Sequence, residues 1–318
     1  MTVLFSVFGM KITAYAVGIA VAAAAALGVL RLRCAKMGLR ARTWDAMALL
    51  ALPLGLICAR LFYCFARFQY YRYDQGGLIS ILRGWEGGYS LWGALGGAVL
   101  AAVIAARITR QKPAPLLDAL APALAIFVAL ERFSEYFDSE LGYGVPVTIP
   151  FFQRLPFAVY NEWWMDWMLA ICLLEGMAAL ILFAVLLRKQ RRPGDTARLF
   201  FVVYGACQIL LESLREDSVP KWLFVKVYQV TALAAMLVLM IAAVVRWALN
   251  KSETRMKTGK MIVWWAVFLL LTGTVVAMEF SLDGKILAEL PGAAAYGIIA
   301  LCCAGMGFCA CRIVLRNE

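Results

Sequence analysis

Histidine is absent from the 318 residues of this chain, and charged residues make up only 16% of it. The first absence removes the side chain that titrates closest to neutral pH, so any proton transfer must use another group. The second excludes a soluble domain of any size, because soluble domains carry about 25% charged residues. The chain also lacks a polar or Ser/Gly-rich linker between its apolar segments, which excludes a series of separate domains.

The nine cysteines lack the Cys-x-x-Cys spacing of common zinc and redox sites. The group CCAGMGFCAC near the C-terminus could suggest a site for a soft metal. Without that spacing, and without any histidine partner, we interpret these cysteines as small packing residues inside apolar segments. We therefore expect neither a metal ion nor a cofactor.

Apolar residues dominate what remains: the chain is 64% hydrophobic and its mean hydropathy is +0.79. About 20 apolar residues in a helix span the hydrocarbon core of a bilayer. Nine such stretches predict an all-α integral membrane protein, a polytopic bundle of about nine transmembrane helices. The stretches are approximately 12–30, 46–66, 88–106, 114–131, 164–187, 198–214, 224–245, 261–279 and 291–311.

The net charge of +11 could indicate a nucleic-acid partner, but its distribution favours membrane topology. Twenty of the 31 Lys and Arg residues lie between alternate spans or in the C-terminal tail, ten lie on the opposite side, and Arg60 lies within a span. By the positive-inside rule, the N-terminus is outside and the C-terminus is cytoplasmic. No nucleic acid is expected. The first span, preceded by Lys11 alone, is too long for a typical cleaved signal peptide.

The outer connections are richer than plain loops. Residues 66–87 are dense in Tyr, Phe and Trp, which predicts an amphipathic arm at the membrane interface, although a simple aromatic belt is an equal alternative. Residues 145–163 contain three prolines and no helical period, so we expect a small outer head at about 132–163. The expected organisation is a membrane domain of residues 1–249 followed by a two-helix membrane extension, residues 250–318.

Charged side chains gather where spans end, most densely in ERFSEYFDSELGYG at 131–144. A charge at the bilayer centre costs about 2.5–3.5 kcal/mol on insertion scales, so such a cluster needs a reason. One explanation is a helix end that is solvated by water. A second explanation, a phosphate-binding site, is favoured by the presence of Arg60, Arg132 and Arg215, because guanidinium groups bind phosphate bidentately and stay charged in a low dielectric. They predict a site for an anionic lipid headgroup at the outer leaflet, with the reaction type left open.

Two further motifs allow a structural and a functional interpretation. In WEGGYSLWGALGG, residues 85–97, glycines such as Gly87 and Gly93 permit close helix packing, and they equally suit a backbone that faces a ligand. Gln208, Glu212 and Arg215 recur at i, i+4 and i+7, which is one face of a helix. That face could carry a structural salt bridge or part of a binding site.

The order of these blocks resembles the bacterial prolipoprotein diacylglyceryl transferases. The blocks are ARLFY, WEGGYSLWGALGG, DALAP, ERFSEYFDSELGYG, PFAVY and YGACQILLESLRED, followed by Gln229, and they cover residues 5–246. The resemblance implies seven family-like helices in a bacterial cytoplasmic (inner) membrane. It also implies a reaction: transfer of the diacylglyceryl group of phosphatidylglycerol to the lipobox cysteine thiol of a prolipoprotein. No protein nucleophile is needed, because the substrate brings its own thiol.

The resemblance also assigns roles to residues. Arg132, Glu135 and Glu140 fall in the family's signature and are expected to be catalytic, with Arg132 binding the phosphate or glycerol part. Such an enzyme must hold the phosphate, help the thiol lose its proton and stabilise the departing phosphate. The expected substrate-binding residues are Tyr15, Arg60, Gly87, Trp92, Gly93, Asp138, Gln208, Glu212 and Arg215.

Four positions differ from the family pattern. Trp92 stands where the family has a histidine, and Gln208 where it has an arginine. Glu135 and Asp138 replace two asparagines. The changes remove one cation and add two potential anions, which weakens the binding of a phosphate diester. Either Glu135 or Asp138 accepts the thiol proton, or the chain is a divergent member that binds lipid or protein without the same catalysis.

A transporter is the main alternative from another class. It predicts inverted repeats and interrupted helices that meet at the bilayer midplane. This sequence has no convincing internal symmetry, and its charges gather at one membrane face. Residues 250–318 lie outside the family pattern, and their middle is apolar and almost uncharged, so we expect packing or partner-binding helices with no catalytic role.

Overall fold

The computed structural model describes residues 3–7, 10–73, 78–84, 87–138, 140–188, 192–217, 220–222, 225–249, 258–286 and 289–315. The chain divides into two compact units. Within the described residues, the first unit comprises segments 1–141, 179–197 and 218–227. The second comprises segments 142–178, 198–217 and 228–318.

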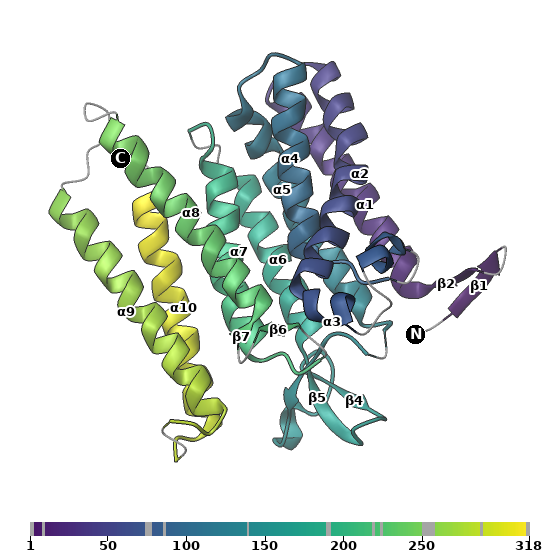
Figure 1. Cartoon of the computed structure of the whole chain (residues 1–318), viewed down its shortest axis with the longest axis vertical. Helices are drawn as coiled ribbons and strands as arrows, with labels where there is room; N and C mark the ends of the chain where they lie inside the picture. Colours follow the sequence, from purple (N-terminus) through teal and green to yellow (C-terminus); the bar gives the residue numbers. More distant parts are fainter. Residues whose placement is uncertain are drawn as a thin grey trace. The chain divides into compact units, whose positions relative to one another are not determined.

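Long helices make up most of the described chain (Figure 1). They are α1 (Ala14–Lys36), α2 (Ala41–Ala66), α4 (Leu91–Ile108), α5 (Pro113–Glu135), α6 (Ile171–Arg188), α7 (Asp195–Ser213), α8 (Val227–Leu249), α9 (Thr258–Leu282) and α10 (Gly292–Val314). Among the described residues, eight of these helices are long and apolar enough to cross a membrane. The exception is α7, which carries Asp195, Arg198, Gln208 and Glu212. The prediction of a polytopic all-α membrane protein is confirmed, and the predicted nine spans become eight plus this more polar helix.

In the first unit, α1 packs against α5, and α4 packs against both α2 and α5. Small residues allow helices to approach closely. A Cβ atom added at Gly93 of α4 would lie 2.7 Å from the Cα atom of Ala59 and 2.8 Å from the Cβ atom of Phe62, both on α2. Such distances are too short for packed atoms, so Gly93 is required by the α2–α4 interface.

Replacing Gly93 with alanine is therefore expected to lower stability by about 1–3 kcal/mol, because the extra methyl group overpacks this interface. Gly96 is the matched control in the same helix, since a Cβ atom there meets nothing within 4 Å. Gly96→Ala should be neutral or slightly stabilising, because alanine favours helix. Thermal unfolding in detergent measures both variants, and equal midpoints for the two would contradict the packing role.

Asp118, from the DALAP segment, links α5 to the start of α7. Its side chain is buried, and its carboxylate accepts hydrogen bonds from the backbone N–H of Gly194 at 2.5 Å and of Ala197 at 2.9 Å. The first N–H groups of a helix have no acceptor within the helix, and the helix dipole favours a negative charge there. Asp118 thus caps α7 from another helix within the first unit.

In the second unit, three antiparallel strands form a sheet in the order β3–β5–β4. They are β3 (Tyr143–Pro146), β4 (Ala158–Asn161) and β5 (Asp166–Ala170), with the 3-10 helix η3 (Pro150–Phe152) between the first two. Met168 and Ala170 are buried at alternate positions of β5, as expected for a strand. The head predicted at about 132–163 stays a prediction, and its first residues, 132–135, lie in α5. The predicted span 164–187 becomes helical only at Ile171, because β5 precedes it.

Helices α9 and α10 lie side by side in the second unit (Figure 1). A Cβ atom at Gly305 of α10 would lie 2.7 Å from the Cδ1 atom of Leu271 on α9. One at Gly307 would lie 3.2 Å from the Cβ atom of Ala206 on α7. The C-terminal helices therefore pack closely on each other, and α10 also packs on α7. A domain boundary at 249/250 stays a prediction.

Several small elements were not predicted in this form. A hairpin of β1 (Val3–Val7) and β2 (Met10–Thr13) precedes α1, whose first turn is capped by the Thr13 hydroxyl at 3.2 Å from the N–H of Ala16. The predicted arm contains α3 (Phe68–Tyr73) and the 3-10 helix η1 (Leu78–Leu82), with exposed apolar side chains. Two short strands, β6 (Lys221–Trp222) and β7 (Val225–Lys226), pair just before α8.

Candidate functional site

A half-open cavity of about 430 Å³ lies between α1, α2, α4 and α5 of the first unit. This volume falls within the range of small-molecule sites, roughly 300–1,000 Å³. Its wall is mainly aliphatic and comprises Ala16, Ile19, Ala23, Ala26, Leu27, Leu30, Ala51, Leu52, Gly55, Leu56, Ala59, Leu91, Ala94, Leu95, Ala98, Leu120, Ala123, Leu124 and Phe127. Such a lining accepts hydrocarbon and offers little to a polar solute.

The polar groups of this cavity gather at one end. Tyr15 opens α1, Tyr89 and Ser90 precede α4, and Glu131 lies in the last turns of α5; all four line the cavity. Tyr15 interacts electrostatically with Glu131, and the N–H of Ser90 donates to the carbonyl of Ala59 at 3.1 Å. The cavity thus has a long aliphatic part and a short polar end.

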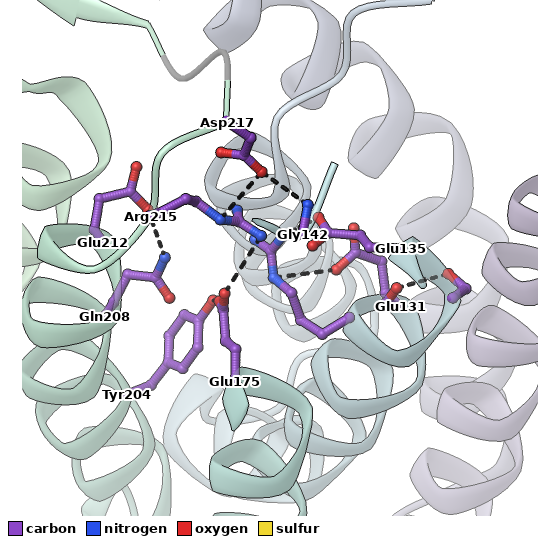
Figure 2. Close-up of polar contacts among 11 residues, drawn as sticks. Glu131, Glu135, Gly142, Glu175, Tyr204, Gln208, Glu212, Arg215 and Asp217 are labelled. Atoms are coloured by element: carbon purple, nitrogen blue, oxygen red, sulfur yellow. Dashed lines mark hydrogen bonds and ion pairs between the residues drawn. The ribbon is translucent and has the colours of Figure 1, made fainter. Parts of the chain in front are cut away.

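The polar end continues into the α5 cluster, which we define as Glu131, Arg132, Glu135 and Asp138. Figure 2 labels Glu131 and Glu135 of this cluster. All four side chains are buried, with exposed fractions of 8%, 5%, 3% and 2% in that order. A solvated helix end would leave these groups in water, so that interpretation is excluded. Buried charges are stable only when they are paired or hydrogen-bonded.

The α5 cluster is held together by charge pairs. Nη1 of Arg132 donates to Oε1 of Glu135, and Nε of Arg132 lies 3.5 Å from Oε2 of Glu131. Oδ1 of Asp138 accepts from the backbone N–H of Glu140 at 3.0 Å. The Glu140 side chain, predicted to be catalytic, is exposed. The structure therefore brings Arg132, Glu135 and Asp138 together with Tyr15.

The charge balance of this cluster is unusual for a phosphate site. One guanidinium lies among three carboxylates, so the ionised cluster carries a formal excess of negative charge. A phosphate group would have to compete with Glu131 and Glu135 for Arg132. The sequence predicted this excess from Glu135 and Asp138, and the burial of Glu131 adds to it.

Arg60 is buried near the end of α2, where its guanidinium binds the backbone of the segment 80–88. Nε donates to the carbonyl of Ile81 at 3.1 Å, and Nη2 donates to those of Ser80 and Arg83, also at 3.1 Å. Nη1 donates to the carbonyls of Gly87 and Gly88. These contacts occupy its donors, so Arg60 orders a loop in this structure, while a direct contact with substrate stays a prediction.

The guanidinium of Arg60 also lies over the ring of Tyr71, 5.3 Å from its centroid. Burial raises the pKa of the Tyr71 phenol to about 12, so the ring is neutral at physiological pH. Gly87 and Gly88 adopt φ angles of +83° and +77°, which suit glycine. A side chain at Gly88 would also meet the Tyr63 ring, so this loop depends on glycine as well as on Arg60.

Replacing Arg60 with lysine is expected to loosen residues 80–88, because an ammonium group cannot reach the carbonyls that the guanidinium fork binds. Limited proteolysis of the detergent-purified protein should then cut this segment at least about tenfold faster. Arg72→Lys is the matched control, since Arg72 is exposed and contacts Tyr73. Equal cleavage of both variants would contradict the ordering role.

Two predicted residues, Trp92 and Gly93, lie in the first turn of α4. Trp92, at the position of the family's histidine, is buried, but the cavity wall on this helix comes from Leu91, Ala94, Leu95 and Ala98. Gly93 faces α2, as described above. Neither residue is placed in the α5 cluster, and their assignment to substrate binding stays a prediction.

A second set of buried polar residues lies in the second unit (Figure 2). We define the α7 cluster as Glu175, Tyr204, Gln208, Glu212, Arg215 and Asp217. Nη2 of Arg215 lies 3.9 Å from Oε2 of Glu175, and its Nε lies 3.5 Å from Oδ2 of Asp217. Nε2 of Gln208 lies 3.3 Å from Oε2 of Glu212, so the predicted helix face is formed as expected.

The β3 strand fixes the backbone that follows α7. The N–H of Val145 donates to the carbonyl of Leu214 at 2.9 Å, and the N–H of Glu216 donates to the carbonyl of Tyr143 at 3.1 Å. The N–H of Gly142 donates to Oδ2 of Asp217 at 2.8 Å. The sheet thus positions the turn that carries Arg215.

Glu175, Tyr204 and Asp217 were not predicted from the sequence. Glu175 is the carboxylate that faces Arg215, and the hydroxyl of Tyr204 donates to its Oε1 at 3.3 Å. A signal was present, because a lone acid inside an apolar span is a functional-site hypothesis by default. Asp217 lies only two residues after Arg215 in the sequence, so it was a candidate partner for that guanidinium.

Apolar helices of membrane-spanning length, an aliphatic cavity with a charged end and two buried arginine–carboxylate clusters define a multi-pass membrane protein with the features of an enzyme that handles lipid. The family model of the prolipoprotein diacylglyceryl transferases matches residues 2–278. The chain belongs to this family of transferases, as the sequence blocks predicted. The match reaches further than the predicted 5–246, and it ends within α9.

Curated relatives carry one name, phosphatidylglycerol–prolipoprotein diacylglyceryl transferase. The relative from Listeria innocua is 31% identical over 190 residues, which are 58% of this chain and 67% of the relative. That from Clostridium novyi is 27% identical over 221 residues, 68% of this chain and 84% of the relative. That from Frankia alni is 28% identical and covers 69% of this chain and 59% of the relative.

Proposed function

We propose that this protein transfers the diacylglyceryl group of phosphatidylglycerol to the cysteine thiol of a prolipoprotein lipobox, next to its signal peptide. Family membership supports the reaction, and the cavity is the structural observation that carries it for this chain. An aliphatic chamber of about 430 Å³ that ends at a charged cluster suits a lipid whose acyl part is buried and whose headgroup is charged. An inner-membrane location, with the N-terminus outside, belongs to the same proposal.

The reaction exchanges one bond to carbon for another. The thiol sulfur loses its proton and attacks the carbon of the diacylated glycerol that is bonded to the phosphate oxygen, forming a thioether. The carbon–oxygen bond to phosphate breaks, and the electron pair leaves with glycerol phosphate, which takes up a proton. The protein must therefore hold the headgroup, accept the thiol proton and stabilise the leaving phosphate.

The α5 cluster supplies groups for two of these tasks. Arg132 binds the phosphate or glycerol part in exchange for one of its carboxylate partners. The released carboxylate, Glu135, becomes a base within reach of the same site, which couples substrate binding to proton acceptance. Tyr15 and Glu131 line the polar end of the cavity, where the glycerol backbone would lie.

The α7 cluster supplies a second buried guanidinium. We assign Arg215 and Glu212 to substrate binding, with Gln208 orienting Glu212 at 3.3 Å. Glu175 and Asp217 hold the Arg215 side chain on two sides, so the group is preorganised before substrate arrives. Gln208 stands where the family has an arginine, and it adds no positive charge to this cluster.

The test uses the full-length protein in vesicles of phosphatidylglycerol with a synthetic lipobox peptide. The expected product is a peptide whose mass increases by one diacylglyceryl group, and a peptide with serine in place of cysteine should stay unmodified. Complementation of a strain depleted of its own diacylglyceryl transferase provides the cellular arm. Failure of both arms would refute the transferase proposal and favour a member that binds lipid or protein without turnover.

A further inference from the structure

The C-terminal helices contribute a carboxylate to the end of α7. Glu279 lies in the last turns of α9, a helix of membrane-spanning length, and its side chain is half-buried. An acid in such a helix is costly, so a partner and a function are expected by default. The family match ends at residue 278, so this carboxylate lies just beyond the part of the chain that the family shares.

One carboxylate oxygen of Glu279 accepts two hydrogen bonds. The hydroxyl of Ser213 donates to Oε1 of Glu279, and Nε2 of Gln229 donates to the same oxygen at 2.7 Å. Nε2 of Gln229 is also 3.0 Å from the Ser213 hydroxyl. Because a serine hydroxyl has a single proton, the bond to Glu279 competes with its alternative acceptor, the carbonyl of Ile209 at 3.1 Å.

Ser213 can affect the positions of both Glu212 and Arg215, because it is the last residue of α7 and lies between them in the sequence. The backbone N–H of Arg215 donates to the carbonyl of Glu212 at 3.2 Å, so both residues belong to one tight turn. The sheet holds this turn through the carbonyl of Leu214. Glu279 is the contact that reaches the same turn from α9.

We propose that Glu279 is a positioning residue for the α7 cluster, acting through Ser213 on the turn that carries Glu212 and Arg215. The proposal rests on the proposed function, because its kinetic consequence is read in the transfer reaction. It makes α9 part of the catalytic unit, in contrast to the prediction that residues 250–318 are packing or partner-binding helices with no catalytic role.

The test compares Glu279→Ala and Glu279→Gln in the full-length protein. The alanine variant should lower kcat/KM about 10- to 30-fold, mainly by raising KM, because the turn that carries the substrate-binding residues Glu212 and Arg215 loses its geometry while the α5 cluster is unchanged. The glutamine variant keeps an acceptor oxygen for Ser213 and should retain activity within about threefold. Asp283→Asn is the matched control, since Asp283 directly follows the last residue of α9, is half exposed and pairs with Lys285 at 3.1 Å.

A double-mutant cycle tests the route through Ser213. Ser213→Ala should cost about as much as Glu279→Ala, and the double variant should cost little more than either one, because they remove the same contact. Additive losses would overturn the positioning role. A wild-type kcat/KM in the alanine variant of an active enzyme would also overturn it, while the proposed function would stand.

Hydrogen exchange provides a readout independent of turnover. Backbone amides 213–217 should exchange at least about tenfold faster in Glu279→Ala, while those of α5 stay unchanged. If the wild type proves inactive in transfer, the proposed function fails and this arm alone decides about positioning. Unchanged exchange at 213–217, or a general loss of protection across α9 and α10, would overturn the inference.

Discussion

Arg132→Ala is expected to lower transfer by about 10²- to 10³-fold, the cost of removing a preorganised group that stabilises charge at a reacting centre. Two effects act together. The lipid phosphate loses its guanidinium partner, and the buried Glu131 and Glu135 lose the cation that lies at 3.5 Å from one of them and hydrogen-bonds the other. The rate of diacylglyceryl transfer to the lipobox peptide measures the loss.

A second variant separates chemistry from folding. Arg132→Lys keeps a positive charge for the two carboxylates, so the protein should fold, but an ammonium group binds phosphate at one point only. The transfer rate of Arg132→Lys should fall about 10- to 100-fold. The variant should remain monodisperse and unfold at the same temperature as the wild type. Arg107→Ala, at an exposed position in the last turn of α4, is the control. Activity of Arg132→Ala equal to that control would refute the assignment.

Glu135→Gln is expected to lower kcat by about 10²- to 10³-fold at pH 7, because the thiol then lacks its proton acceptor. The defect should shrink as the pH rises from about 7 to 9. A free cysteine thiol has a pKa of about 8.5, so above it the substrate arrives already ionised and needs no base. The ratio of wild-type to variant kcat, measured across this range, is the test.

Asp138 provides the matched control for that experiment. It is as buried as Glu135, but its Oδ1 accepts from the backbone of Glu140, and an asparagine oxygen can accept the same bond. Asp138→Asn should therefore stay within about threefold of the wild type. A defect of Glu135→Gln that does not change with pH, or a larger defect in Asp138→Asn, would move the base to another residue.

The membrane class of the fold was predictable because hydropathy and helix length are local properties of the sequence. The arginines and the acids of the α5 cluster were predictable too, since charges at span ends stand out against apolar neighbours. The three-stranded sheet was not, because β3 and β5 pair across residues 147–165, a segment that also contains η3 and β4. The prolines of that segment and its lack of a helical period indicated only that no helix would form there.

Partners were the least predictable part of the site. Nothing in the sequence near Arg60 shows that five carbonyls of residues 80–88 surround its guanidinium. Glu175 and Glu279 were visible as acids in apolar segments, yet their partners on α7 are set by tertiary packing. Residue chemistry therefore predicted which groups matter, and the packing decided what each one holds.

The bond between Ser213 and Glu279 also has a consequence for the order in which the protein matures. The chain is made from its N-terminus, and 66 residues separate the two partners. The end of α7 therefore cannot reach its final hydrogen bonding until α9 has been synthesised and inserted. Assembly of the α7 cluster is thus a late event in biogenesis, and a nascent chain arrested before residue 279 would hold lipid-facing helices with an unfinished catalytic end.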